Sequence, residues 1–459
     1  MRKSLLDQLP LVPVAIDHDH ARELAVISTV LDQLPEAVQL IYEDLCRGRK
    51  RRIDPSKGRG GMAAEQILRV VMLKQLTGLC YEDLAFHLAD SNTYRAFCRF
   101  GFDRKVPDEA TLQRNVKGVR AETWQAIHRL VALKAEQLGV ETGKRARVDC
   151  TVVNSNIHHP TDSSLLWDSV RVLVRIMGQA EDKFGIDFHD HSRRAKRRAV
   201  GIMNAKTKAD RSKLYRDLIK VTTKTVAQAA KVAECLDQVE AASVVEAALA
   251  QGFATELRHY GGLAGQVISQ TERRIFGGQT LPPSEKVVSI FEPHTDIIIK
   301  DRRDTLYGHK ICLTSGASGI VTDVVVLGGN PADSTLAVAM IERHKALFGH
   351  VPLQAAFDGG FASRDNLTSI KNLGVQDVAF SKRCRLDISD MAKSPRVYRQ
   401  LKNFRAGIEA GISFLKRAFG LGRCLWRGFE SFCAYVHASV VSCNLLLIAR
   451  HVLAARKTA

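Results

Sequence analysis

Two aspartates stand in segments that are expected to form buried strands. Asp358 ends the apolar run "LQAAFD", and Asp149 lies among the β-branched residues of "RARVDCTVV". A charge buried in such a strand costs several kcal/mol unless it is paired or binds a metal. In an open α/β sheet, ligands bind beyond the carboxyl ends of the strands. Both carboxylates are therefore candidate functional groups, and Gly359 and Gly360 would let a bulky ligand approach the backbone closely.

Helical geometry supplies a third carboxylate. Glu409 and Lys416 follow Arg405 by four and eleven residues, so the three side chains lie within about 40° of one another around a helix. An apolar stripe runs beside them, made of Phe404, Ile408, Ile412, Leu415 and Phe419. An Arg–Glu pair at this spacing by itself stabilises a helix by only a few tenths of a kcal/mol. The two aspartates are what favour a functional role for Glu409.

The segments around these carboxylates alternate between strand and helix patterns. Strands are predicted over Arg147–Val153, in "TDIIIKD", "HKICLTSG", "GIVTDVVVLGG" and "QDVAFS", and in the run that ends at Asp358. One helix is predicted with Asn330 and Pro331 at its N-cap and first position. Another runs from near Ser363 to Leu373, with Gly374 as its stop. The order predicts a mixed α/β sheet with helices on its faces.

Helical patterns dominate the remaining regions. Residues 20–140 carry them, including "AAEQILRVVMLKQLTG" and a start signal at Pro107 and Asp108. They are consistent with a DNA-binding and oligomerisation domain, or with a helical bundle that carries solvated charges. The stretch from about residue 160 to 290 is low in Pro and Gly and reads as a helical insert between the first two strands. The apolar C-terminal segment contains His437, Asn444 and Arg450, which favour a buried closing helix over a membrane span.

The amino-acid composition indicates what kind of molecule the protein binds. The chain has 459 residues, and Lys and Arg outnumber Asp and Glu by 67 to 49, which gives a formal net charge of +18. This excess gathers in Arg47–Arg52 and Arg193–Arg198, so a partner with many phosphates is expected. The ten cysteines form no Cys-x-x-Cys pair, and an N-terminus broken by Asp7 and Pro10 does not read as a secretory signal. Reduced thiols in a cytoplasmic protein are expected.

Together, these motifs resemble the DDE transposases of bacterial insertion sequences. The resemblance covers most of the chain and rests on "YEDLAFHLAD", "VPDEATLQR", "VDCTVVNSN", "YGHKICLTSGASGIVTDVVVLGGNPADS", "AAFDGGF" and "RAGIEAGISFLKR". Related families carry their third carboxylate in a Tyr-x2-Arg-x3-Glu-x6-Lys signature. Arg405, Glu409 and Lys416 fit this spacing, whereas Lys402 occupies the tyrosine position. The resemblance implies an RNase H-like mixed sheet flanked by helices.

The resemblance also implies a division of the chain and a chemistry. Residues 1–140 would bind DNA and form oligomers, residues 145–430 would form the catalytic domain with its insert, and residues 431–459 would form a C-terminal helix. The protein would bind terminal inverted repeats, cleave the element ends by hydrolysis and join the 3′-hydroxyls to target DNA. Asp149, Asp358 and Glu409 would hold two Mg²⁺ ions, with Mn²⁺ as an alternative. The DNA contacts would come from Arg405, Lys416, Arg193, Arg194, Lys196, Arg197 and Arg198.

Other interpretations of the sequence remain open. A transposase-derived repressor or architectural protein would bind DNA without cleaving it, and an RNase H-like nuclease would cut without joining. Asp387 and Asp390 are rivals of Glu409, although "RCRLDISDMAKSP" has no helical period and reads as a loop. The pair His158 and His159 could bind a softer metal, but a loop role is favoured. Asn154 and Asn156 are turn residues or groups that contact DNA.

Overall fold

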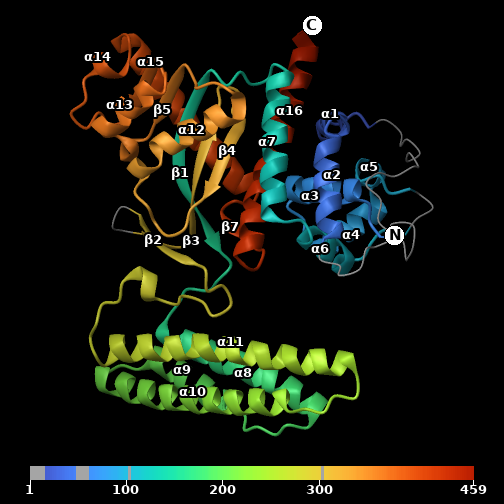
Figure 1. The fold of residues 1–459 in the computed structure, drawn as a ribbon, viewed down its shortest axis with the longest axis vertical. Helices are drawn as coiled ribbons and strands as arrows, with labels where there is room; N and C mark the ends of the chain where they lie inside the picture. Colours follow the sequence, from blue (N-terminus) through green and yellow to red (C-terminus); the bar gives the residue numbers. More distant parts are fainter. Residues whose placement is uncertain (1–15, 48–60, 102–104, 301–303, 459) are drawn as a thin grey trace. The chain divides into compact units, whose positions relative to one another are not determined.

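A computed structural model describes residues 16–47, 61–101, 105–300 and 304–458 (Figure 1). The chain divides into two compact units. The core unit comprises Met1–Ser155 and Gly308–Ala459, and the insert unit comprises Asn156–Tyr307. Of the basic run Arg47–Arg52, all but Arg47 lies outside the described residues.

A mixed sheet forms the centre of the core unit. The strands of the sheet are β1 (Arg145–Ser155), β2 (Asp296–Lys300), β3 (Asp304–Ser315), β4 (Val321–Val326), β5 (Gln354–Phe357), β6 (Asp377–Phe380) and β7 (Arg423–Cys424), of which β2 and the start of β3 belong to the insert unit. The strand order is β2-β3-β1-β5-β6, with β4 also paired to β3 and β7 to β1. β1 is antiparallel to β3, where Asp149 lies opposite Leu313, and parallel to β5. The predicted mixed α/β sheet flanked by helices is confirmed.

Alternating side chains of β1 serve two separate cores. Val148 and Cys150 point into a core shared with β5, β6 and the helices that follow them, whereas Val153 belongs to a core shared with the N-terminal and C-terminal helices. This alternation is the period of two that a strand imposes. Asp149, Arg147 and Val153 have the same parity, so Asp149 points away from the core that contains Val148.

Seven helices precede the sheet among the described residues. They are α1 (Asp19–Asp32), α2 (Pro35–Cys46), α3 (Ala64–Thr77), α4 (Tyr81–Asp90), α5 (Asn92–Phe97), α6 (Glu109–Lys117) and α7 (Ala121–Gln137). α3 ends at Gly78, whose φ of +70° suits glycine. Asp108 caps α6, and its side chain accepts the backbone N–H of Thr111. Both boundaries confirm the sequence-based expectation, because capping is a local property.

The remaining elements of the core unit alternate with its later strands. The helices are α12 (Ala337–Phe348), α13 (Arg364–Asn372), α14 (Ile388–Met391), α15 (Pro395–Ala418) and α16 (Phe429–Thr458), and short 3₁₀ turns are η2 (Asp333–Thr335) and η3 (Gly359–Phe361). α13 begins after its cap Ser363 and is followed by Gly374, as predicted. The predicted helix start at Asn330 and Pro331 is wrong, because η2 intervenes and α12 begins only at Ala337. The carbonyl of Pro331 instead accepts a hydrogen bond from Lys310 Nζ.

The C-terminal helix α16 packs beside α7 in Figure 1. By length and composition α16 could cross a membrane, but 89% of its most apolar window is buried in the protein. Asn444 lies in this buried helix and joins it to β4, because its side chain accepts the N–H of Val321 and donates to the carbonyl of the same residue. The closing helix therefore contributes to the core, as the sequence suggested.

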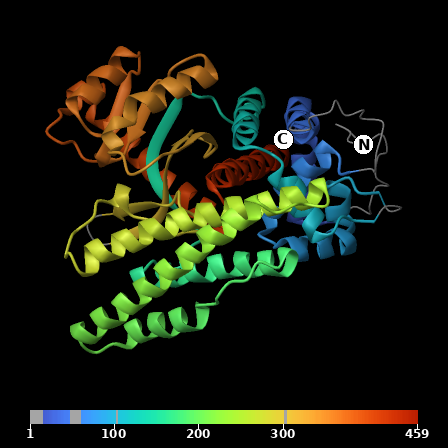
Figure 2. The ribbon, with the colours of Figure 1, turned by 60° about the horizontal axis from the view of Figure 1, so that its bottom comes forward.

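The insert unit is helical, as predicted. Its helices are α8 (Asp162–Phe184), α9 (Ser192–Asn204), α10 (Lys208–Asp237) and α11 (Val244–Ile275), followed by the short turn η1 (Pro283–Glu285). Figure 2 shows the long green and yellow helices lying side by side, and α8, α10 and α11 contact one another in all three pairs. Their apolar faces enclose a core of their own.

Candidate active site

Three carboxylates from distant parts of the chain meet at one guanidinium group. Arg405 Nη2 lies 3.1 Å from Asp149 Oδ2 and 2.9 Å from Asp358 Oδ1. Arg405 Nη1 lies 2.7 Å from Glu409 Oε1. The structure thus brings Asp149, Asp358, Glu409 and Arg405 together, and the carboxylates come from β1, the end of β5 and α15.

Asp149 is the most enclosed of the three carboxylates, with 14% of its side chain exposed. Its Oδ1 accepts the backbone N–H of Cys150 at 2.8 Å. Burial raises the pKa of the Asp149 carboxyl above its usual range, and the nearby charges of Asp358 and Asp333 act in the same direction. The guanidinium of Arg405 opposes this rise without cancelling it.

Asp358 directly follows β5, at the carboxyl end of the strand. Ser381 Oγ donates to its Oδ1 at 2.8 Å. Partial burial raises the pKa of this carboxyl, but the Ser381 hydroxyl, the backbone N–H groups of Gly359 and Gly360, and Arg405 together lower it below the usual range. Asp358 is therefore held ionised at neutral pH.

The two glycines after Asp358 make room for protein side chains. A Cβ built on Gly359 would lie 2.9 Å from Lys382, and one built on Gly360 would lie 2.8 Å from Asp333 Oδ2. Both approaches are closer than real Cβ contacts allow. The expectation that these glycines clear space for a bulky ligand therefore needs correction, because Lys382 and Asp333 occupy that space.

A close approach between α15 and β1 positions Arg405 and Glu409. Arg147 on β1 donates from Nη1 to the carbonyl of Phe404 at 3.0 Å, and its guanidinium stacks over the Phe404 ring. A Cβ on Gly407 would lie only 2.1 Å from Arg147 Nη1. Gly407 thus leaves room for the Arg147 guanidinium, and no local pattern in the sequence indicates this role.

The turn that carries Asp358 is joined to the preceding 3₁₀ turn by residues that sequence reasoning also missed. Asn366 on α13 donates to the carbonyls of Ser334 in η2 and Phe361 in η3, at 2.7 and 2.8 Å. Asp333 forms an ion pair with Lys310 of β3. We call these contacts, through which α13 and β3 hold η2 and η3, the turn clamp. The sequence signal at this place is the segment "NPADS", whose Asn330 and Pro331 predict a helix start.

The three carboxylates are suitable ligands for a hard divalent cation. In this structure they surround the guanidinium of Arg405 instead. Carboxylate oxygens are the ligands that Mg²⁺ and Mn²⁺ prefer, and these three already surround one positive charge. Across the described residues, no group of three or more Asp, Glu, His or Cys side chains stands ready to hold a metal ion. The three carboxylates are therefore of the right chemical type to bind Mg²⁺ or Mn²⁺. The guanidinium of Arg405 lies between them, where a metal ion would have to bind.

The rest of the predicted signature lies along α15. Lys416 is half-buried, two turns beyond Glu409, whereas Lys402, at the tyrosine position, is exposed. Asp387 and Asp390 are exposed and lie at the start and within the single turn of α14. Of the rival carboxylates, Glu409 is the one that contacts the Arg405 guanidinium.

The predicted basic run forms the exposed face of α9 in the insert unit. Arg193, Lys196 and Arg197 are exposed. Arg194 and Arg198 both form ion pairs with Asp217 on α10. Asp217 therefore compensates part of the positive charge of this run.

The histidine pair in the insert unit has contacts typical of a loop. His158 Nε2 lies 2.6 Å from Asp168 Oδ2, and His159 packs edge-on against Tyr307. These contacts agree with the favoured loop interpretation. Of the two asparagines, Asn154 belongs to β1 and Asn156 is exposed directly after it.

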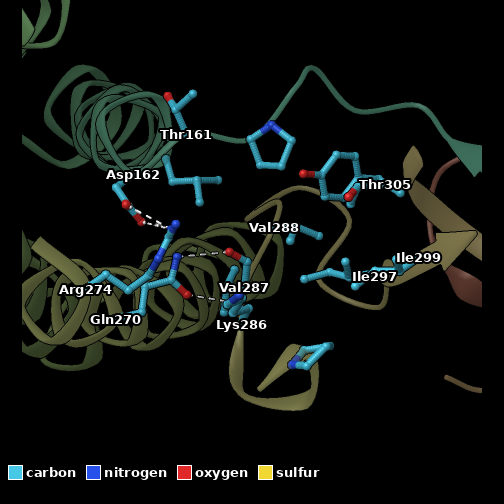
Figure 3. A pocket seen from close by; sticks show the side chains of 14 residues that line it. Thr161, Asp162, Gln270, Arg274, Lys286, Val287, Val288, Ile297, Ile299 and Thr305 are labelled. Carbon is cyan, nitrogen blue, oxygen red and sulfur yellow. Dashed lines mark hydrogen bonds and ion pairs between the residues drawn. The ribbon is translucent and has the colours of Figure 1, made fainter. Parts of the chain in front are cut away.

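A cavity of about 250 Å³ lies within the insert unit, where the start of α8 meets the end of α11 (Figure 3). Arg274 Nη1 donates to both carboxylate oxygens of Asp162 at 2.9 Å. Gln270 pairs with the backbone N–H and carbonyl of Val287. These polar groups satisfy one another, so the cavity reads as a packing gap between elements.

Comparisons with known families agree with this geometry. Residues 15–118 match a family described as Transposase domain (DUF772), and residues 299–445 match the Transposase DDE domain. The chain belongs to the DDE transposases of insertion sequences. No curated protein and no solved structure matches it. The resemblance inferred from the motifs is thereby confirmed, and with it the RNase H-like class of the sheet.

The matched ranges include some residues of the site in this transposase and leave out others. The DDE match contains Asp358, Arg405, Glu409 and Lys416, whereas Asp149 precedes it. The grouping of Asp149 with the other two carboxylates thus comes from the structure, where β1 is paired to β5 and contacts α15. A transposase DDE domain indicates an enzyme that processes DNA.

Proposed function

We propose that this transposase cleaves the ends of its element by metal-dependent hydrolysis and joins the freed 3′-hydroxyls to target DNA by transesterification. The observation that carries the proposal is the convergence of Asp149, Asp358 and Glu409 on the single cation Arg405. Three carboxylates drawn from separate elements form a site for positive charge, and a phosphodiester reaction needs such charge at its reacting oxygens.

Each residue has a proposed part in this chemistry. Asp149, Asp358 and Glu409 would hold Mg²⁺ through their carboxylate oxygens. Bound Mg²⁺ supplies activation of the attacking hydroxyl and stabilisation of the leaving oxygen. Asp358 is suited to this role because its lowered pKa keeps it ionised at neutral pH. Arg405 and Lys416 would bind phosphates of the DNA through charge-assisted hydrogen bonds.

The proposed substrate is double-stranded DNA, first the terminal inverted repeats and then the target. The net charge of +18 and the exposed Arg193, Lys196 and Arg197 on α9 support binding to phosphates. Residues 1–140 would take part in DNA binding and oligomerisation, and the insert would contact DNA or a second protomer. A homo-oligomer on DNA would hold two ends together for joining, and the nucleoid of a bacterial cytoplasm is the proposed location.

A labelled element end tests this function. Full-length protein is incubated with the labelled duplex, target plasmid and Mg²⁺, and products are resolved by electrophoresis. We expect wild-type protein to cut and join. Asp149→Asn, Asp358→Asn and Glu409→Gln should keep DNA binding but lose cleavage and joining by at least about 100-fold, since each removes a ligand charge.

Asp387→Asn and Asp390→Asn are the matched controls, because both residues are exposed and lie outside the carboxylate group. They should react as wild type does. Binding without cutting would support the silent DNA-binding protein, and cutting without joining would support the nuclease. Near-normal joining by Glu409→Gln, together with loss in a control variant, would remove Glu409 from the site.

A further inference from the structure

Arg405 directs most of its donor capacity to the three carboxylates. Its side chain is only 14% exposed, and its two terminal nitrogens contact Asp149, Asp358 and Glu409. Among the described residues, its buried Nε has no hydrogen-bond partner. Release by at least one carboxylate would free a pair of N–H donors for a phosphate.

In this arrangement Arg405 would compete with a metal ion for the three carboxylates. Asp149 Oδ2 and Asp358 Oδ1, which face Arg405 Nη2, are oxygens of the kind that a divalent cation would bind. A divalent cation bound to these oxygens would lie close to the guanidinium, and two positive groups at such distances repel each other strongly. We propose that Arg405 is the exchangeable counter-ion of the three carboxylates. Divalent cation binding displaces its guanidinium, which then binds a DNA phosphate.

Every group in this exchange has an alternative partner. Without Arg405 or a cation, three carboxylates would repel one another, so the free protein needs the guanidinium to hold them together. Glu409 is 64% exposed and Asp358 is 38% exposed, which leaves a route from solvent to the site. Once displaced, a guanidinium matches a phosphate as well as it matches a carboxylate.

A coupling between metal and DNA follows from this exchange. If the cation releases Arg405 for a phosphate, the cation raises DNA affinity, and by linkage DNA raises cation affinity to the same extent. The inference rests on the proposed function, since it takes the carboxylates as the metal site. It adds that the protein holds its own competitor for the metal until DNA arrives.

Mg²⁺ titration of the full-length protein without DNA is the direct test. Arg405→Gln should bind Mg²⁺ at least about tenfold more tightly than wild type, because a competing unit charge at hydrogen-bond distance is gone. Arg399→Gln is the matched control: it removes an exposed charge from the same helix and should change Mg²⁺ affinity by less than about twofold. Calorimetry gives the affinities, and melting curves verify folding.

The second measurement is DNA affinity by fluorescence anisotropy, with and without Mg²⁺, on a duplex with blocked 3′ ends. Wild type should gain about tenfold from Mg²⁺, and Arg405→Gln should gain clearly less. If the variant does not fold, Arg405→Lys is used, since a compact ammonium group cannot span three carboxylates and should also bind Mg²⁺ more tightly than wild type.

Two results would overturn the exchange. One is Mg²⁺ affinity of folded Arg405→Gln that equals or falls below that of wild type, and the other is an unchanged gain in DNA affinity. Neither result touches the proposed function, which depends on cleavage by wild type and on the three carboxylate variants. Conversely, absence of cleavage in wild type with intact Mg²⁺ competition would contradict the function and leave the counter-ion role standing.

Discussion

At the scale of single residues, the buried carboxylate of Asp149 lowers the free energy of unfolding at neutral pH. The raised pKa of this carboxyl means that the folded protein holds its proton more tightly than the unfolded chain does. Stability is therefore lost as pH rises from the unfolded pKa of about 3.9 through the raised folded pKa. At neutral pH without metal, Asp149→Asn should remove this cost and melt at a higher temperature than wild type.

Melting curves from pH 4 to pH 8 without metal check this prediction. The stability advantage of Asp149→Asn should shrink toward pH 4, because the unfolded wild type also begins to bind the proton there. Glu409→Gln serves as control, since an exposed carboxylate pays little desolvation and its loss should change stability by less than about 1 kcal/mol. A lower melting temperature for Asp149→Asn at neutral pH would show that the Arg405 pair outweighs burial.

Gly407 offers a second test at the residue scale. A Cβ at this position would lie 2.1 Å from Arg147 Nη1, so Gly407→Ala should displace the Arg147 guanidinium from its hydrogen bond to the Phe404 carbonyl. We expect a loss of about 1–3 kcal/mol in unfolding free energy, as for overpacked cores, together with loss of cleavage. Urea denaturation and the labelled-end reaction measure both effects.

Gly411 on the same helix is the matched control for Gly407. No described atom lies within 4 Å of a Cβ built there, so Gly411→Ala should raise helix stability by about 0.5–1 kcal/mol. Cleavage should stay at the wild-type level. Equal stability of the two alanine variants would mean that α15 does not depend on its close contact with Arg147.

At the scale of elements, the turn clamp decides where Asp358 points. Asn366→Ala removes both donors to the carbonyls of Ser334 and Phe361, which should cost about 1–3 kcal/mol because buried acceptors are left unpaired. We expect the single-turnover cleavage rate to fall while DNA affinity stays the same, since the clamp acts on the Asp358 turn alone.

Asn372→Ala, an exposed position at the end of the same helix α13, controls for general effects on that helix. Its stability should stay within about 0.5 kcal/mol of wild type, and its cleavage rate should be unchanged. Denaturation and quenched-flow cleavage distinguish the two variants. A wild-type cleavage rate in folded Asn366→Ala would mean that the Asp358 turn keeps its place without the clamp.

At the scale of the whole molecule, the excess of positive charge should make DNA binding strongly dependent on salt. Each phosphate contact adds about −0.9 to the slope of log affinity against log salt. Replacing Arg193, Arg194, Lys196, Arg197 and Arg198 with alanine should flatten that slope. The structure refines this expectation, because Arg194 and Arg198 are paired with Asp217.

The triple variant of Arg193, Lys196 and Arg197 should therefore give most of the change in slope, and the double variant of Arg194 and Arg198 should give less. Anisotropy titrations from 50 to 300 mM salt, about the range in which phosphate contacts weaken, measure both. An unchanged slope in the five-residue variant would identify the run as a solvated surface.

The sequence by itself determined what depends on neighbours along the chain. The helical phase of Arg405, Glu409 and Lys416, the caps Asp108 and Ser363, and the strands that carry the two aspartates could all be predicted, because periodicity and capping act over a few residues. These local features were enough to place each carboxylate on an element.

Only the tertiary structure decided which groups meet. Arg405 and Asp149 lie 256 positions apart in sequence, and nothing in a local pattern specifies their contact. For the same reason the sequence could not show that Gly360 makes room for Asp333, or that Gly407 makes room for Arg147. The need for glycine at these positions arises from atoms of another element, and those atoms approach only when the sheet and its helices have packed together.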